Sequence, residues 1–275
     1  AVNPKVTNNV TDAKKKVPDK SDNTVDKPAK KKENVVSGKT EKYSLRKYDH
    51  VYDFYSRIAE PATKICLEEN VPPAAVLAIA GLESGWNQGY VGRITGNILS
   101  LGTRRGDTEL PALYLPKSIS TGKVLFDSLV IVKHNDDDLD WEKRPPSLKK
   151  DYRPEPWAGT PNHLAYFKYH PKEKAKAQAN NIKDFVTLFI SRKSGIKVYR
   201  DARHLMDSLV AVHGKSILLK EETAVQFINS IGGKPNSFNF RETWPKKVQY
   251  IIKNAGLAEL TAELYTSEKP IKEIW

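Results

Sequence analysis

The feature that most constrains how this chain can fold is an apolar run of twelve residues from Val71 to Leu82. Pro72 and Pro73 lie near its start, and proline suits the first turn of a helix, where an N–H has no intrahelical partner. A helix that is apolar on every side is stable when other elements surround it. The run therefore predicts a central helix in a fold of several helices. It is shorter than the ~18 apolar residues that a membrane span needs.

Helical spacing of apolar residues recurs along much of the chain. Between Tyr48 and Asn70 such residues occur at three- and four-residue steps, and Pro61 is expected to divide or kink this helix. Five later segments have the same period, and glycines mark the turns after several of them. These predicted helices cover residues 123–134, 172–194, 201–213, 220–231 and 243–258.

The helical period is lost between residues 99 and 120, where glycines and prolines interrupt the pattern. The short apolar run 112–115 fits a strand, so we expect a β-hairpin lobe within this stretch. Residues 135–161 are rich in Asp, Pro and Trp and are expected to form a long surface excursion. The predicted fold class is therefore mainly α (α+β), with a helical body and a small β-hairpin lobe.

The first part of the chain has a different composition from the rest. Residues 1–42 hold eleven Lys, four Asp and two Glu, and no Leu, Ile, Met or aromatic residue. Such a segment buries too little apolar surface to offset the entropy lost on ordering. We predict a disordered Lys-rich tail at residues 1–46 and one folded domain at residues 47–275. The tail is either a solvated tether or a segment that attracts polyanions.

Several kinds of site are disfavoured by the sequence. A single cysteine, Cys66, excludes an intrachain disulfide and a zinc site built on several thiolates. The six His residues do not form the paired motif of a helical zinc protease. Asp136, Asp138 and Asp140 alternate as in a calcium loop, but Trp141 stands where that loop requires Gly. We therefore expect no metal and no cofactor.

Glu83 follows the apolar run directly and is the residue that least suits its surroundings. A carboxylate at the end of a central helix is costly unless it is paired or faces a cleft. Desolvation raises the pKa of such a group. A carboxylic acid that keeps its proton near neutral pH can protonate a leaving-group oxygen, as a glycosidase requires. The alternative is a helix-end Glu that points to solvent or caps a neighbour.

The residues after Glu83 carry a resemblance to a known family. Gly85 and Trp86 complete Glu-Ser-Gly-Trp, and Asn97 follows Glu83 by fourteen residues in Gly-Asn-Ile-Leu-Ser-Leu-Gly. This resembles the glucosaminidase-type peptidoglycan hydrolases, a lysozyme-like family with Glu-Ser-Gly-aromatic and then an Asn-Leu-Phe-Gly-like stretch at this separation. Two weaker blocks follow in the family's order, at residues 167–169 and 237–252.

The resemblance implies a lysozyme-like helical body in which Glu83 is the general acid. It also implies a second carboxylate in the β lobe, for which Glu109 is the nearest candidate, with Asp107 beside it. By their place in the matching blocks, Asn97 and Phe238 are expected near the substrate. Phe238 stands where the family usually has Tyr, so this chain lacks the Tyr hydroxyl that could take part in the chemistry there.

Aromatic side chains outside the core are the other candidates for a saccharide groove. Their flat faces and polar edges suit sugar rings, although ordinary packing is the alternative for each of them. The candidates are Trp86, Tyr90, Tyr166 and Tyr169.

We therefore predict an enzyme that cleaves β-1,4 glycosidic bonds of peptidoglycan glycan strands, of the N-acetylglucosaminidase type. The alternatives are a muramidase, a lytic transglycosylase on the same substrate, or a non-catalytic cell-wall-binding module. We expect a periplasmic or secreted monomer whose leader was removed before Ala1, with no membrane span. A nucleic-acid partner is not expected, because only the net charge of +12 favours it.

Overall fold

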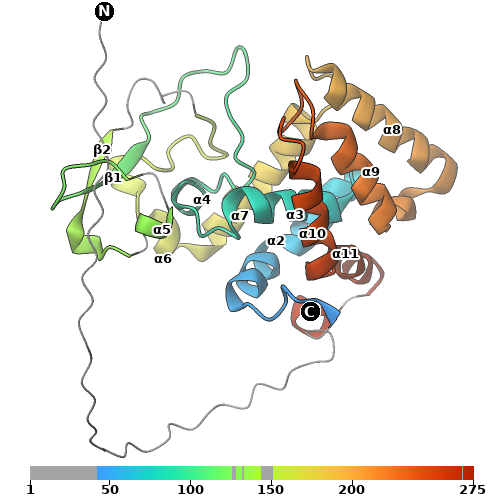
Figure 1. Cartoon of the computed structure of the whole chain (residues 1–275), viewed down its shortest axis with the longest axis horizontal. Helices are drawn as coiled ribbons and strands as arrows, with labels where there is room; N and C mark the ends of the chain where they lie inside the picture. Colours follow the sequence, from blue (N-terminus) through green and yellow to red (C-terminus); the bar gives the residue numbers. More distant parts are fainter. Residues whose placement is uncertain (1–41, 126–127, 132, 144–150, 268) are drawn as a thin grey trace, which may run out of the picture. The chain divides into compact units, whose positions relative to one another are not determined.

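The computed structural model describes residues 42–125, 128–131, 133–143, 151–267 and 269–275 (Figure 1). Most of the predicted tail, residues 1–41, lies outside this part of the chain. Residues 42–46, which the sequence assigned to the tail, instead pack on the folded body. The backbone N–H of Leu45 donates to the carbonyl of Asn254 at 3.0 Å. The buried Arg46 guanidinium donates to the carbonyls of Ala255 and Gly256. The body therefore begins before residue 47.

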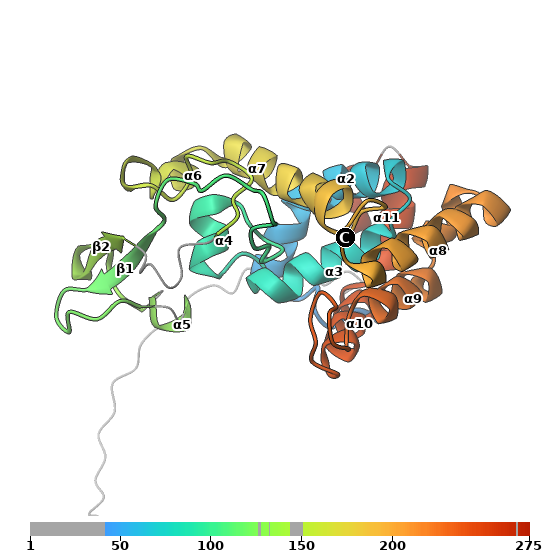
Figure 2. The same cartoon turned by 90° about the horizontal axis from the view of Figure 1, so that it is seen from above.

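The apolar run forms the central helix of the body, as predicted. Helix α3 (Pro73–Ser84) is buried along its whole length from Pro73 to Gly81. Helices α2 (Asp49–Glu68), α9 (Glu221–Ile231), α10 (Trp244–Ala255) and α11 (Leu257–Thr266) contact it. Figures 1 and 2 both place α3 among these helices. Burial on every side stabilises a helix that has no polar face.

The remaining described helices are short or amphipathic. A π-helical turn, Phe185–Phe189, ends α7, and a 3-10 helix, Lys215–Leu219, joins α8 to α9. Two more 3-10 turns cover Asp136–Asp138 and Pro161–His163. The other α-helices are α4 (Tyr90–Thr95), α5 (Ser128–Ile131), α6 (Tyr166–Tyr169), α7 (Pro171–Asp184), α8 (Lys197–His213) and α12 (Ile271–Ile274).

Three predicted helices differ from the structure in instructive ways. Pro61 lies inside α2, which continues through it as one helix. The predicted helix 243–258 is two helices, because Gly256 adopts a left-handed conformation with φ of 61° between α10 and α11. The predicted helix 123–134 is represented only by α5, and residues 126–127 and 132 lie outside the described part.

In the part of the chain that the structure describes, two antiparallel strands form a sheet, β1 (Tyr114–Ser118) and β2 (Leu139–Lys143). Pro116 lies opposite Trp141 in the register. The expectation of a small β lobe is confirmed, and β1 lies within residues 99–120 as expected, but its partner strand lies outside this stretch. β2 comes from the stretch expected to be a surface excursion, because long-range pairing gives β1 a partner that local pattern cannot reveal.

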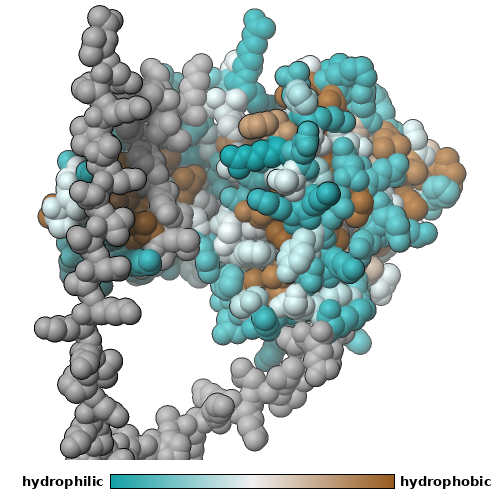
Figure 3. Space-filling view, in the orientation of Figure 1, coloured by the Kyte–Doolittle hydropathy of each residue, from teal (hydrophilic) through white to brown (hydrophobic). Residues whose placement is uncertain are grey.

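The surface of the body is mainly polar. Figure 3 shows hydrophobic residues scattered among hydrophilic ones at the α8 and α9 end, and Val212 of α8 is 75% exposed. Such isolated apolar side chains are normal on protein surfaces. None of the described helices combines the length and the apolar character needed to cross a membrane.

Candidate active site

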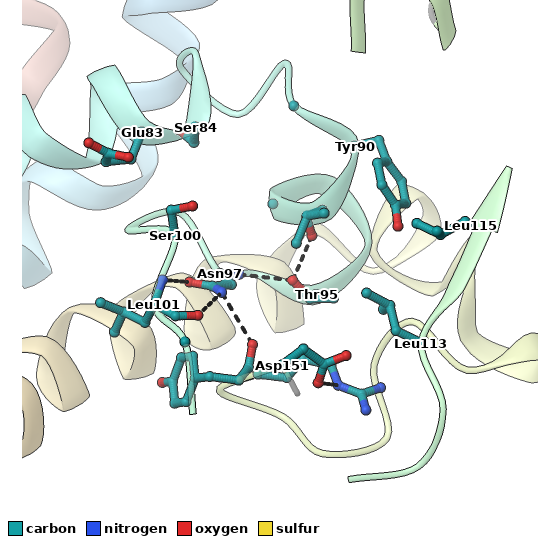
Figure 4. A pocket seen from close by; sticks show the side chains of 16 residues that line it. Glu83, Ser84, Tyr90, Thr95, Asn97, Ser100, Leu101, Leu113, Leu115 and Asp151 are labelled. Carbon is teal, nitrogen blue, oxygen red and sulfur yellow. Dashed lines mark hydrogen bonds and ion pairs between the residues drawn. The ribbon is translucent and has the colours of Figure 1, made fainter. Parts of the chain in front are cut away.

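A cleft of about 420 Å³ opens beside the C-terminal end of α3. Five segments line it: the end of α3, the segment 89–95 with α4, the loop 97–102, the start of β1 with the residue before it, and residues 151–153. Glu83 comes from the helical wall, and Asp151 comes from a loop on the opposite wall (Figure 4). The volume is within the range of about 300–1,000 Å³ that is typical of ligand sites.

Glu83 owes its position to the way α3 ends. Gly85 adopts a left-handed conformation with φ of 56°, and its N–H closes the helix on the carbonyl of Leu82. Glycine adopts this conformation without strain, so Gly85 ends α3 directly after Glu83 and Ser84. The Glu83 side chain therefore leaves the last turn of the central helix at the rim of the cleft.

The Glu83 carboxyl is half-buried and has a single hydrogen bond from the described residues. The indole Nε1–H of Trp244 donates to Glu83 Oε1 at 2.8 Å. The ion pairs of the described residues do not include Glu83. Burial raises the pKa of Glu83, while the Trp244 hydrogen bond and the charge of Arg241 act in the opposite direction. The net shift of the Glu83 pKa is upward.

Trp244 is held in place by its own neighbours. Phe238 packs against it with ring centroids 5.5 Å apart. Gly232 lies so close that a β-carbon there would be 2.2 Å from the indole ring. The sequence placed Phe238 at the substrate, but the cleft lining does not include it. Phe238 instead supports the tryptophan that donates to Glu83.

Asn97 is buried, and its polar atoms bond to the protein. Its Nδ2 donates to the carbonyls of Leu101 at 2.9 Å and Tyr152 at 3.2 Å. Its Oδ1 accepts from the Leu101 N–H at 3.0 Å and from Asn181 Nδ2 at 3.2 Å. An amide side chain has two donors and two acceptor positions, so this set is complete. Asn97 therefore shapes the cleft wall that it lines, and its role in binding sugar stays a prediction.

Asn181 of α7 extends this network and was missed by sequence reasoning. Its Oδ1 accepts from the backbone N–H groups of Ile98 at 2.9 Å and Leu99 at 3.0 Å. Asn181 is completely buried. Complete burial is the signal that identifies Asn181 as part of this network. Burial is known only from the fold, so the sequence could not have identified this residue.

Asp151 is the second carboxylate in the cleft lining, and sequence reasoning missed it. Asp151 Oδ1 lies 3.3 Å from Arg153 Nε, and the Arg153 side chain is 1% exposed. The guanidinium of Arg153 also donates to the backbone carbonyls of Ala158, at 2.6 Å, and Pro111. A buried Arg anchored to backbone on two sides fixes the carboxylate that it contacts.

Glu109, the predicted second carboxylate, lies elsewhere. It is exposed on the loop before β1 and does not line the cleft. Its neighbour Asp107 is engaged with Arg104, whose backbone N–H donates to it at 2.8 Å. The structure therefore places Glu109 outside the lining of the cleft that Glu83 lines, and Asp151 becomes the candidate for the second carboxylate.

The four predicted aromatic residues do not gather at one place. Tyr90 lines the cleft and donates from its hydroxyl to the carbonyl of Tyr114 at 3.3 Å. Trp86 lies in a separate apolar depression with residues of α10 and donates to the Tyr55 hydroxyl at 3.3 Å. Tyr169, which is 69% exposed, lines a different pocket, and Tyr166 stacks on His170. Of these four, only Tyr90 lies at the cleft.

No protein-family model, curated protein or solved structure matches this chain. The site is therefore assigned from its own geometry. Within the described ranges, no group of three or more His, Cys, Asp or Glu side chains is arranged to hold a metal ion.

The cleft pairs two carboxyl groups in unlike environments. Glu83 is desolvated and accepts one neutral hydrogen bond, whereas Asp151 contacts a guanidinium. The two carboxyl groups therefore differ in solvation and in the charge of their neighbours. Two further polar residues line the cleft. Ser100 is exposed there and has φ of 53°. The hydroxyl of Tyr152 donates to Asp184 at 2.5 Å. The arrangement is suited to proton transfer onto a bound oxygen.

Proposed function

We propose that this protein is a glycoside hydrolase that cleaves β-1,4 bonds of peptidoglycan glycan strands, with Glu83 as the general acid. One observation carries the proposal. A half-buried carboxyl at the end of the central helix faces a cleft, has a raised pKa, and forms no ion pair with a described residue. This is what protonation of a leaving-group oxygen near neutral pH requires.

The proposed reaction uses both walls of the cleft. Glu83 donates its proton to the bridging oxygen as the bond from that oxygen to the anomeric carbon breaks. Because Trp244 bonds to Oε1, the other oxygen of Glu83 is available for the proton that is transferred. Asp151 supplies negative charge for the positive charge that develops on the sugar ring. Water adds to the anomeric carbon, and a proton returns to Glu83.

Peptidoglycan is favoured as the substrate by charge as well as by the Glu83 segment. The chain has a formal net charge of +12, and this increases the rate of encounter with a wall that carries carboxylates. The resemblance of the segment that follows Glu83 favours cleavage after N-acetylglucosamine. Such a substrate places the protein in the periplasm or outside the cell.

The decisive experiment compares Glu83→Gln with Glu109→Gln on purified peptidoglycan. Glu83→Gln is expected to lower the release of soluble reducing sugar at least about 100-fold, because a general acid contributes ~10²–10⁴-fold. It should remain folded, since it replaces a desolvated carboxyl with a neutral amide of similar size. Glu109→Gln is the matched control and should retain the wild-type rate. Full activity of Glu83→Gln would overturn the catalytic assignment.

Mass spectrometry of the products identifies the bond. An N-acetylglucosamine reducing end supports the proposed specificity, and a muramic acid reducing end replaces it with that of a muramidase. An anhydro-sugar end identifies a transglycosylase. Tight binding to cell walls without any product from the wild-type protein would make it a binding module.

A further inference from the structure

A second pocket, of about 770 Å³, shares Tyr90 with the cleft. It is lined by residues of α2, α4, β2, α6 and the start of α7. Trp141 and Tyr169 contribute aromatic walls. The basic residues of the lining are Arg57, Arg93, Lys168 and Lys174, together with His134. We call this set of residues the basic pocket.

The positive charge of the basic pocket is not balanced by its own lining. None of the described residues that line it is Asp or Glu. Arg93 has no ion pair with a described residue, and Arg57 donates to the backbone carbonyl of Asp53 at 2.6 Å. Lys174 lies 2.8 Å from the amide oxygen of Asn87 in the preferred orientation of that amide, which is a neutral partner.

The pKa of Lys174 reflects the proximity of the other cations in the basic pocket. Burial, followed by the charges of Arg57 and Arg93, lowers the pKa of Lys174 to about 8. A bound anion would stabilise all three cations and would restore the pKa of the ammonium. Guanidinium groups bind carboxylates with two parallel hydrogen bonds, so Arg57 and Arg93 are suited to this ligand.

We infer that the basic pocket binds free carboxylates of the peptide stems carried by the glycan strand whose sugars occupy the cleft. This inference rests on the proposed function. Tyr90 lines both sites, so a saccharide in the cleft lies next to the pocket that would receive its substituent. The aromatic walls accommodate the apolar parts of a peptide, and the cations neutralise its carboxylates. The pocket thereby selects for glycan strands that carry uncapped, anionic stems.

The test measures binding of a disaccharide-peptide with free carboxylates and of the same compound with amidated carboxylates. All proteins carry Glu83→Gln so that no ligand is cleaved, and calorimetry gives the affinities. The protein with a wild-type pocket should bind the free-carboxylate form at least about tenfold more tightly, the range of a charge-assisted hydrogen bond. Arg93→Gln and Lys174→Met should each bring this ratio close to one.

Lys176→Met is the matched control, because Lys176 is an exposed residue of α7 outside the pocket lining and its loss changes the net charge equally. It should retain the preference. The inference is overturned if neither pocket variant changes the ratio, or if Lys176→Met changes it as much. Stronger binding of a phosphate-bearing wall polymer at the same residues would replace the peptide stem as ligand.

This result is separable from the outcome for catalysis. If the wild-type protein released no sugar but the pocket still bound carboxylates selectively, the proposed enzymatic function would be wrong and the inference about the basic pocket would stand. If the wild-type protein released sugar but the pocket showed no preference for free carboxylates, the enzymatic function would stand and the inference about the basic pocket would be wrong.

Discussion

The two walls of the cleft are built by different means. The helical wall presents Glu83 from the last turn of α3, a helix that is buried because its sequence is apolar. The loop wall is formed by residues 97–102 and 151–153, which lack regular structure. Asn97 bonds the first segment to the second, Asn181 bonds the first to α7, and Arg153 bonds the second to the carbonyl of Ala158. One wall is fixed by apolar packing, and the other by buried hydrogen bonds.

Because of this difference, single substitutions should affect the two walls to different degrees. Apolar packing is shared among many contacts, so the position of Glu83 depends little on any one of them. A buried polar network depends on each member, because removing one leaves its partners unsatisfied. The loop wall should therefore be the more sensitive to single substitutions, and the following predictions test this.

Asp151→Asn should have the largest effect. The substitution keeps the shape of the side chain but removes the negative charge beside Arg153. We expect sugar release to fall at least about 100-fold, a loss comparable to that expected for a catalytic carboxylate. Kinetics on purified peptidoglycan provide the measurement, and Asp107→Asn, outside the cleft lining, is the control. Near-normal turnover by Asp151→Asn would show that the loop wall contributes no charge to the chemistry.

Asn181→Ala should destabilise the loop wall. It removes the acceptor for the N–H groups of Ile98 and Leu99 and the donor to Asn97. Leaving buried groups unsatisfied costs about 1–3 kcal/mol in the free energy of unfolding. Denaturant titration measures this loss. Asn180→Ala is the neighbouring control, since Asn180 is less buried and donates to Glu155 at 3.1 Å. Equal losses in both variants would contradict a special role for the network.

Trp244→Phe should have a smaller effect that is confined to the pH dependence. The indole hydrogen bond lowers the pKa of Glu83, so its removal should raise that pKa further. A general acid is active when protonated, and activity declines as pH rises through its pKa. The declining limb of the pH–rate profile should therefore move to higher pH. Trp157→Phe, in a separate apolar cluster, should leave the profile in place. A shift to lower pH would disprove the role given to Trp244.

The helices could be predicted from periodicity because they depend on residues a few positions apart. The central helix, its end at Gly85 and the position of Glu83 all follow from the segment 71–85. The strand partner could not be predicted in this way, because the pairing of Leu115 with Glu142 joins segments that are far apart in the chain. Glu109 was selected as the nearest candidate for the β-lobe carboxylate that the family resemblance implies, and a position along the sequence does not determine the direction of a loop.

The sequence by itself determined that an acidic residue would end a buried helix, since twelve apolar residues before Glu83 leave the helix no exposed face. The tertiary structure alone decided what faces that acid. Asn97, Asn181 and Tyr152, the neighbour of Asp151, come together through hydrogen bonds across long sequence separations, and no local pattern specifies such bonds. Tyr90 likewise became a shared wall of two pockets only when α4 packed near the β lobe.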